Sequence, residues 1–279
     1  MKIKIITDST SDISKEYAIK NDISVLPIGI EIEGDFYREG IDITPREFYD
    51  KLKVAIKLPH TSQINEYAFC EIIDKYKNTD TFFCIMPLSK ELSNTYYSAE
   101  NAIKNYPDER FFLCETMTAT VGLAMLIDYA NTLSKKDNMT SETFISEIEQ
   151  FKTRIAVYGL ISELKYLKMG GRLTAGASLI GTILKISPLV TINGKVQVVS
   201  KHIGKSKCFA ELANLVAQRD YEYPVFIGHS DCKDMTNQLI EKEKDILKLD
   251  GRACYFDMGA AIGTHSGPGA VVMAFIKKK

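Results

Sequence analysis

The first half of the chain alternates apolar segments with amphipathic ones, and this alternation most restricts the folds available to it. The apolar segments have the length of buried strands and lie at residues 3–8, 23–34, 81–88 and 110–116. Helical patterns separate them at residues 11–21, 44–56 and 65–77, with Ser11 or Asp12 and then Thr44-Pro45 as start signals. Strands separated by helices pair in parallel and need helices on both faces, so the pattern predicts a covered parallel sheet.

From about Arg154 the pattern changes to closely spaced strands. Six candidates follow one another, in the segments IAVYGLI, ISPLVTI, KVQVVSK, PVFIGHS, RACYFDM and AVVMAFI. Asn193-Gly194 between the second and third is a hairpin turn signal. Helices near 205–219 and 231–247 separate the later strands. We therefore predict an α/β protein of two domains, residues 1–153 and residues 154–279, with the six strands in the second.

Bulk properties exclude several classes of function. The 279 residues carry a formal net charge of −1, which gives no overall attraction to nucleic acid or to an anionic membrane. The six cysteines form no CxxC pair and the histidines form no HxxxH pair, so we expect no metal site. No apolar run reaches the roughly 20 residues of a membrane span. We expect a cytoplasmic protein with at most transient membrane contact.

Three loops carry small polar residues where strands or helices end. Thr61 and Ser62 precede one predicted helix, and Ser93 and Asn94 precede another. Such residues commonly cap helices, but free N–H groups at helix starts also bind carboxylates or phosphates. The third loop, "AAIGTHSGPGAV", places His265 in a glycine-rich turn where it is a turn residue, a base or a ligand-binding group.

Together, these loops resemble the DegV family over essentially the whole chain. The resemblance is carried by TDSTSD (7–12), TSQIN (61–65), LSNTYYSA (92–99), GGRLTAGASLIGTILKISPLV (170–190), IGHSDC (227–232) and IGTHSGPGAV (262–271). It implies two α/β domains, with a parallel sheet between helix layers in the first and a six-stranded mixed sheet in the second. It also implies a long acyl ligand in the cleft between them.

The family is similar to the fatty-acid-binding subunit of bacterial fatty acid kinase, which presents the fatty acid carboxylate to a separate ATP-binding subunit. The resemblance implies a bound fatty acid with no intrinsic cofactor and no catalytic residue. Four residues would hold the carboxylate: Thr61, Ser62, Ser93 and His265. Four more would lie near the head group or face the partner: Asn94, Arg172, Thr264 and Ser266.

The chain also departs from the family pattern. Ile203 stands where many members carry arginine, and Asn94 replaces a glycine. The change at Ile203 weakens the expectation of a kinase partner more than that of a carboxylate site. Nearby lysines could supply charge without the bidentate geometry of arginine: Lys201, Lys205 and Lys207.

A fatty acid needs an apolar tunnel and a few donors, because each buried CH₂ contributes about 0.8 kcal/mol and an unpaired buried carboxylate is costly. Residues 177–186 are expected to wall the tail, and a protonated His265 to donate to the head group. Two alternatives remain open. One is a serine-type acyl hydrolase with Ser93 as nucleophile, and the other is a binder of a small polar ketone that resembles dihydroxyacetone kinase.

Overall fold

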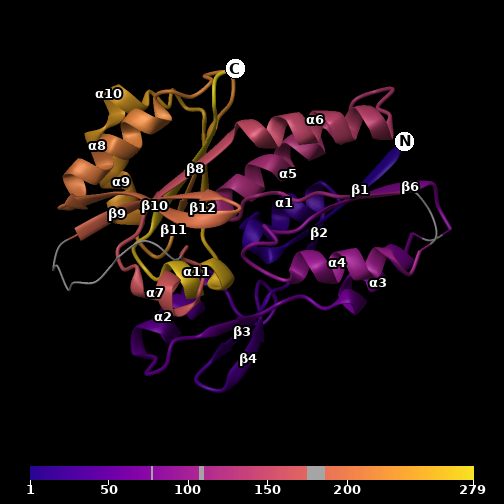
Figure 1. The fold of residues 1–279 in the computed structure, drawn as a ribbon, viewed down its shortest axis with the longest axis horizontal. Coiled ribbons are helices and arrows are strands. Elements are labelled where there is room, and N and C mark those ends of the chain that lie inside the picture. Colours follow the sequence, from indigo (N-terminus) through magenta and orange to yellow (C-terminus); the bar gives the residue numbers. More distant parts are fainter. Residues whose placement is uncertain (77, 107–109, 175–185) are drawn as a thin grey trace.

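The computed structural model describes residues 1–76, 78–106, 110–174 and 186–279, and two main sheets organise its fold (Figure 1). The first sheet is parallel throughout, in the order β2-β1-β6-β7. Its strands are β1 (Lys2–Asp8), β2 (Ser24–Leu26), β6 (Thr81–Met86) and β7 (Phe111–Leu113). The predicted parallel sheet is therefore confirmed.

Helices cover both faces of this sheet. Ile6 of β1 and Phe83 of β6 belong to a core with α3 and α4, whereas Ile5 and Cys84 belong to another with α1, α5 and α6. Neighbouring residues of one strand point to opposite faces, so the strands are apolar on both sides. The helices are α1 (Lys15–Lys20), α3 (Glu66–Asp74), α4 (Thr95–Ile103), α5 (Thr120–Ser134) and α6 (Ser141–Arg154).

The segment 23–34 is not the single strand that its sequence indicates. Pro27 has no N–H to donate to a ladder and separates β2 from β3 (Gly29–Ile32). Strand β3 instead joins β4 (Asp35–Arg38) and β5 (His60–Ser62) in a small antiparallel sheet of order β4-β3-β5. The sequence patterns did not indicate this sheet, which places Thr61 on an ordered strand.

The starts of the first two helices differ in how well the sequence indicates them. Helix α1 begins at Lys15 with Ser14 as N-cap, so the prediction of Ser11 or Asp12 was wrong. Residues 9–11 form a separate 3-10 turn, η1 (Ser9–Ser11), because the Asp8 carboxylate accepts from the Thr10 N–H. The Thr44-Pro45 signal is confirmed, since α2 (Pro45–Val54) starts there with a capping box to Glu47.

The second main sheet contains all six strands predicted in the second half, in the order β10-β9-β8-β13-β11-β12. Only the β11–β12 pair is parallel, so the sheet is mixed. Gly194 forms the β9–β10 turn with a φ of +72°, which favours glycine. The strands are β8 (Ile155–Leu160), β9 (Ile186–Asn193), β10 (Lys195–Ile203), β11 (Val225–His229), β12 (Ala253–Asp257) and β13 (Val271–Ile276).

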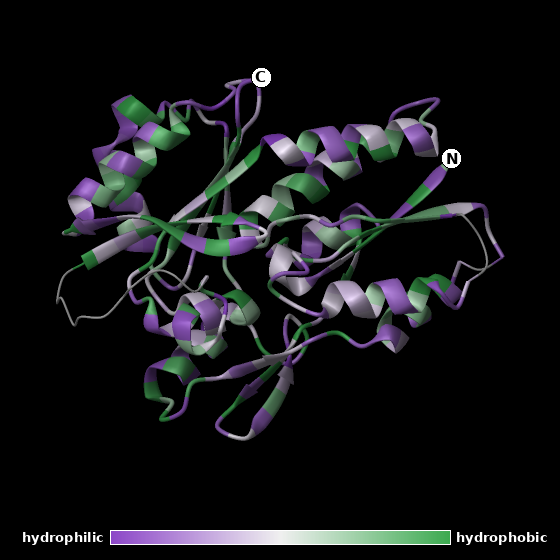
Figure 2. Ribbon diagram, viewed as in Figure 1, coloured by the Kyte–Doolittle hydropathy of each residue, from purple (hydrophilic) through white to green (hydrophobic). Residues whose placement is uncertain are grey.

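Helix α5 lies between the two main sheets and contacts both (Figure 1). Its first two turns are buried without interruption from Thr120 to Ile127. Figure 2 shows α5 as largely hydrophobic, whereas the outer helix α6 mixes hydrophilic and hydrophobic residues. A helix that is apolar around its circumference needs partners on all sides, which the two sheets supply. The far face of the mixed sheet packs on α8 (Lys205–Val216), α9 (Lys233–Lys242) and α10 (Lys244–Leu247).

The segment that contains His265 is a helix and not the turn that its glycines suggest. Helix α11 (Ala260–Ser266) begins after Gly259, and buried carboxylates from the first half of the chain hold its start. Asp12 accepts from the Gly259 N–H and Glu39 accepts from the Ala261 N–H, both at 2.8 Å. These bonds satisfy N–H groups that a helix start leaves without a partner in the helix.

We predict that Asp12→Ala lowers the free energy of unfolding by about 1–3 kcal/mol, because it leaves buried donors without an acceptor. Asp42→Ala is the matched control, since Asp42 pairs with Arg38 at the surface. It should cost about 0–1 kcal/mol. Urea unfolding of both variants measures the difference. An equal loss in the two would contradict the role assigned to Asp12.

Candidate functional site

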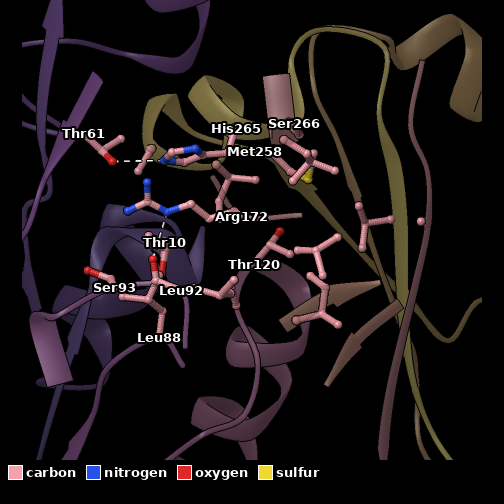
Figure 3. Close-up of a pocket in the computed structure, with 18 of the residues that line it drawn as sticks. Thr10, Thr61, Leu88, Leu92, Ser93, Thr120, Arg172, Met258, His265 and Ser266 are labelled. Atoms are coloured by element: carbon pink, nitrogen blue, oxygen red, sulfur yellow. Dashed lines mark hydrogen bonds between the residues drawn. The ribbon is translucent and has the colours of Figure 1, made fainter. Parts of the chain in front are cut away.

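A single pocket joins residues from the two halves of the chain (Figure 3). The space between the lining atoms is about 830 Å³, open solvent at the mouth included. Most of its lining is aliphatic. The apolar lining comprises Ile28, Leu88, Leu92, Ala119, Gly159, Ile161, Leu167, Val190, Ile192, Val196, Met258, Ala261, Ile262 and Val272.

Polar side chains gather on one side of the pocket, as Figure 3 shows for Thr61, Ser93, Arg172 and His265. Thr61 on β5 and His265 on α11 come from elements 204 residues apart, and Thr61 Oγ1 lies 3.0 Å from His265 Nε2. The structure therefore brings together three of the residues proposed to hold a carboxylate. The fourth, Ser62, also lines the pocket but lies at its exposed edge.

Gly170 fixes the position of the His265 ring. It follows α7 (Lys165–Met169), and a Cβ added there would lie 2.3 Å from His265 Nδ1. Only a residue without a side chain allows the imidazole to approach the backbone this closely. His265 Nδ1 is buried, with no hydrogen-bond partner in the described part of the chain.

Arg172 extends its guanidinium into the same part of the pocket. Its Nε donates to the Leu92 carbonyl at 3.1 Å and its Nη1 donates to the Gly170 carbonyl at 2.5 Å. Burial lowers the pKa of Arg172, but an arginine remains charged in proteins. No carboxylate in the ranges that the structure describes forms an ion pair with it. The pocket thus contains a positive charge that no acidic side chain of the described residues pairs with.

The remaining residues implied by the family resemblance lie in different places. Ser266 lines the pocket and donates to the Gly267 carbonyl at 3.1 Å. Thr264 is buried within α11, where its hydroxyl donates to the Ala260 carbonyl at 2.8 Å, and it is not part of the lining. Asn94 is exposed before α4 and does not line the pocket either.

Two polar lining residues, Thr10 and Thr120, are absent from the sequence-based list of site residues. Thr10 lies in TDSTSD, a segment whose Ser, Thr and Asp residues are more typical of helix capping than of a binding site. Thr120 donates to Asp12 at 2.7 Å and has a φ of +49°, which is unusual for a β-branched residue. A backbone conformation of this kind leaves no signature in the sequence, so Thr120 could not be found there.

The tail wall expected at residues 177–186 lies outside the described residues, apart from Ile186 at the start of β9.

Across the described ranges, no group of three or more His, Cys, Asp or Glu side chains is placed to hold a metal ion. Among the described helices, none combines the length and the apolarity that crossing a membrane requires.

A family model described as "Uncharacterised protein, DegV family" matches residues 2–278. The chain belongs to the DegV family. A DegV domain-containing protein of Clostridium perfringens is 31% identical over 288 residues, which cover 99% of this chain and 97% of that protein.

Solved structures of DegV proteins share the whole fold. A fatty acid binding DegV family protein from Streptococcus agalactiae has a TM-score of 0.89 at 27% identity, and the match covers 100% of both chains. A structure described as fatty acid binding of a DegV family protein from Thermus thermophilus has a TM-score of 0.87 at 25% identity. That match covers 99% of this chain and 100% of the other. The α/β fold class predicted from the sequence, with a parallel sheet and a six-stranded mixed sheet, is confirmed.

The charge state of the DegV pocket differs from the one suggested by the sequence. Burial, and then the neighbouring charges of Arg172 and His60, lower the pKa of His265 to about 4. The imidazole is therefore neutral at pH 7 and protonates only as the pH falls through about 4. Arg172, rather than a protonated His265, supplies the positive charge.

We predict that the NMR signals of His265 in ligand-free protein titrate with a midpoint at about pH 4. Arg172→Gln should raise this midpoint, because it removes the second-largest cause of the shift. Arg38→Gln, at an exposed arginine, should leave the midpoint unchanged. A wild-type midpoint near the ordinary histidine value of about 6.5 would contradict the neutral imidazole.

Proposed function

We propose that this DegV family protein binds a long-chain fatty acid in the pocket, with the carboxylate held by Thr61, Ser93 and His265. Arg172 provides the counter-charge, Ser62 adds a hydroxyl group at the exposed edge, and the buried Ser266 adds another inside the pocket. The observation that carries the proposal is an aliphatic pocket in which the Arg172 guanidinium lies beside these donors and pairs with no acidic side chain of the described ranges. DegV proteins of similar fold that are described as fatty acid binding support it.

The physical requirements of a fatty acid match the two parts of this pocket. The aliphatic walls favour the tail, since each buried CH₂ contributes about 0.8 kcal/mol. An ionised head group would be costly to bury alone, but a carboxylate beside Arg172 is paired and accepts charge-assisted hydrogen bonds. A neutral His265 can still donate one hydrogen bond from a ring N–H.

We further propose that residues 1–153 and 154–279 act as two domains with the ligand in the cleft between them. The first half supplies Thr61, Ser93 and Leu92 to the pocket, and the second supplies Arg172 and His265. A ligand that touches both halves would bind only when they keep this relative position. The continuous core around α5 favours that position with or without ligand.

The proposed role is to present the carboxylate to a separate ATP-dependent kinase subunit, which makes the acyl phosphate. Ser62 and Asn94 lie exposed near the polar side of the pocket, where a partner could reach the head group. Ile203 is 78% exposed at the end of β10, close in sequence to Lys201, Lys205 and Lys207, so it does not contribute to the core. Because ATP is the phosphoryl donor, the proposed reaction takes place in the cytoplasm.

The geometry favours a carrier over the two alternative functions. The Ser93 hydroxyl interacts with Thr95 Oγ1 at 3.0 Å, and His265 Nε2 interacts with Thr61 Oγ1, so these two side chains are not hydrogen-bonded to each other. A serine hydrolase needs that bond and an acidic partner for its histidine. A small polar ketone would leave the aliphatic walls without a ligand to cover them.

We predict that an organic extract of the purified protein contains a fatty acid when analysed by mass spectrometry. After delipidation, Arg172→Gln should weaken binding of hexadecanoic acid by roughly tenfold to a hundredfold. This corresponds to the loss of about 1.5–3 kcal/mol for a hydrogen bond to a charged group. Fluorescence titration measures the affinity, and Arg38→Gln is the control with an exposed arginine.

Two outcomes would contradict the carrier proposal. One is delipidated wild-type protein that folds but binds no fatty acid. The other is stable labelling of Ser93 by a fluorophosphonate probe, which would favour the hydrolase instead.

A further inference from the structure

A row of four paired residues crosses the mixed sheet, and three of them form part of the pocket floor. Val190 on β9 pairs with Gly159 on β8, Gly159 pairs with Val272 on β13, and Val272 pairs with Gly228 on β11. Residues paired across neighbouring strands point to the same face of a sheet. Val190, Gly159 and Val272 line the pocket, whereas Gly228 does not.

The two glycines of this row have different surroundings. A Cβ added to Gly228 would meet Val121 Cγ1 of α5 at 2.8 Å and Met258 Cγ at 3.1 Å. The missing side chain at Gly228 is therefore replaced by side chains from the opposite layer. At this end of the row, α5 packs directly on the sheet, and Gly228 lies outside the pocket.

Gly159 is not covered in this way. The three atoms nearest to its added Cβ all belong to Val271 and Val272 of the neighbouring strand, at 2.9 to 3.6 Å. Because Gly159 lines the pocket, the space above it is pocket space rather than packed core. Gly159 thus leaves a groove between the side chains of its paired neighbours Val190 and Val272, and Val272 Cγ2 narrows it, since this atom lies 2.9 Å from the added Cβ.

The same face continues along β8 toward the polar side of the pocket. Ile161, two residues after Gly159, also lines the pocket, and the chain then leads through α7 to Gly170 beside His265. The alternate residues of β8 point to the opposite face, and two of them, Ala156 and Leu160, belong to the core there. A ligand anchored at His265 and Arg172 that extends along this face would pass Ile161 and reach Gly159.

We propose that Gly159 determines which acyl chains the protein accepts, because the tail passes through the groove between Val190 and Val272. The inference rests on the proposed fatty-acid binding and adds a specificity-determining residue to it. A groove of this width fits an unbranched methylene chain. A side chain at position 159 would block the groove and shorten the usable pocket without touching the head-group site.

Affinities for decanoic, dodecanoic, tetradecanoic and hexadecanoic acid, measured on delipidated protein, test this inference. For the wild type, affinity should rise with chain length, by up to about fourfold per methylene buried. Gly159→Val should bind decanoic acid nearly as well as the wild type does. It should bind hexadecanoic acid at least tenfold more weakly, so that the dependence on chain length becomes flat.

Two further variants separate blocking from general damage to the fold. Ala156→Val adds bulk to the same strand on the far face and should keep the wild-type dependence on chain length. Gly159→Ala combined with Val272→Ala removes the methyl group that a Cβ at 159 would contact, which protects folding if Gly159→Val is unstable. In this double variant, the affinity for branched-chain acids relative to straight-chain acids should be higher than in the wild type, because Val272 no longer narrows the groove.

The results distinguish failure of this inference from failure of the proposed function. If the wild type binds none of the four acids, the fatty-acid proposal itself is wrong. If the wild type binds them and folded Gly159→Val shows the same preference for long chains, only the assignment of Gly159 is overturned. Loss of all four acids by the same factor in Gly159→Val would also overturn it, because that pattern indicates damage to the head-group site.

Discussion

Burial of α5 between the two main sheets is the interaction on which the rest of the structure depends. One face of the helix packs on the parallel sheet and another packs on the mixed sheet, so that a single hydrophobic core joins the two halves of the chain. An apolar helix of this kind is stable only when both partners are present. The pocket lies at the start of this helix, where Ala119 and Thr120 contribute to its lining.

The polar side of the site depends on a second set of contacts between the halves. Burial raises the pKa of Asp12 well above its usual range, while hydrogen bonds from the Gly259 N–H and the Thr120 hydroxyl oppose the shift. Glu39 makes a similar contact with the Ala261 N–H. These carboxylates fix the start of α11, and the position of His265 at the other end of that short helix follows from them.

The sequence suggested that His265 supplies both a hydrogen bond and the positive charge of the site, but in the structure these two roles belong to different residues. Burial in the largely aliphatic pocket removes the proton from the imidazole at neutral pH. Arginine keeps its charge under comparable burial because its ordinary pKa is several units higher. His265 therefore contributes geometry and a neutral hydrogen bond, while Arg172 contributes charge.

The sequence by itself determined the strands and helices whose hydrophobic period is long and regular. It indicated the parallel sheet, the six later strands, the hairpin at Gly194 and the start of α2, because each depends on neighbouring residues. Together with the family resemblance, it also indicated which loops carry the candidate head-group residues. It did not indicate the β4-β3-β5 sheet or the helix around His265, since glycines and short strands give weak local signals.

Only the tertiary structure decided how these residues meet. Thr61 and His265 are 204 residues apart in the chain, and their 3.0 Å contact depends on the packing of β5 against α11. The neutral state of His265 depends on burial, which no local pattern reports. The different surroundings of Gly159 and Gly228 likewise depend on where α5 ends over the sheet. Local sequence specifies the elements, whereas the pocket is formed from their contacts, which are long-range.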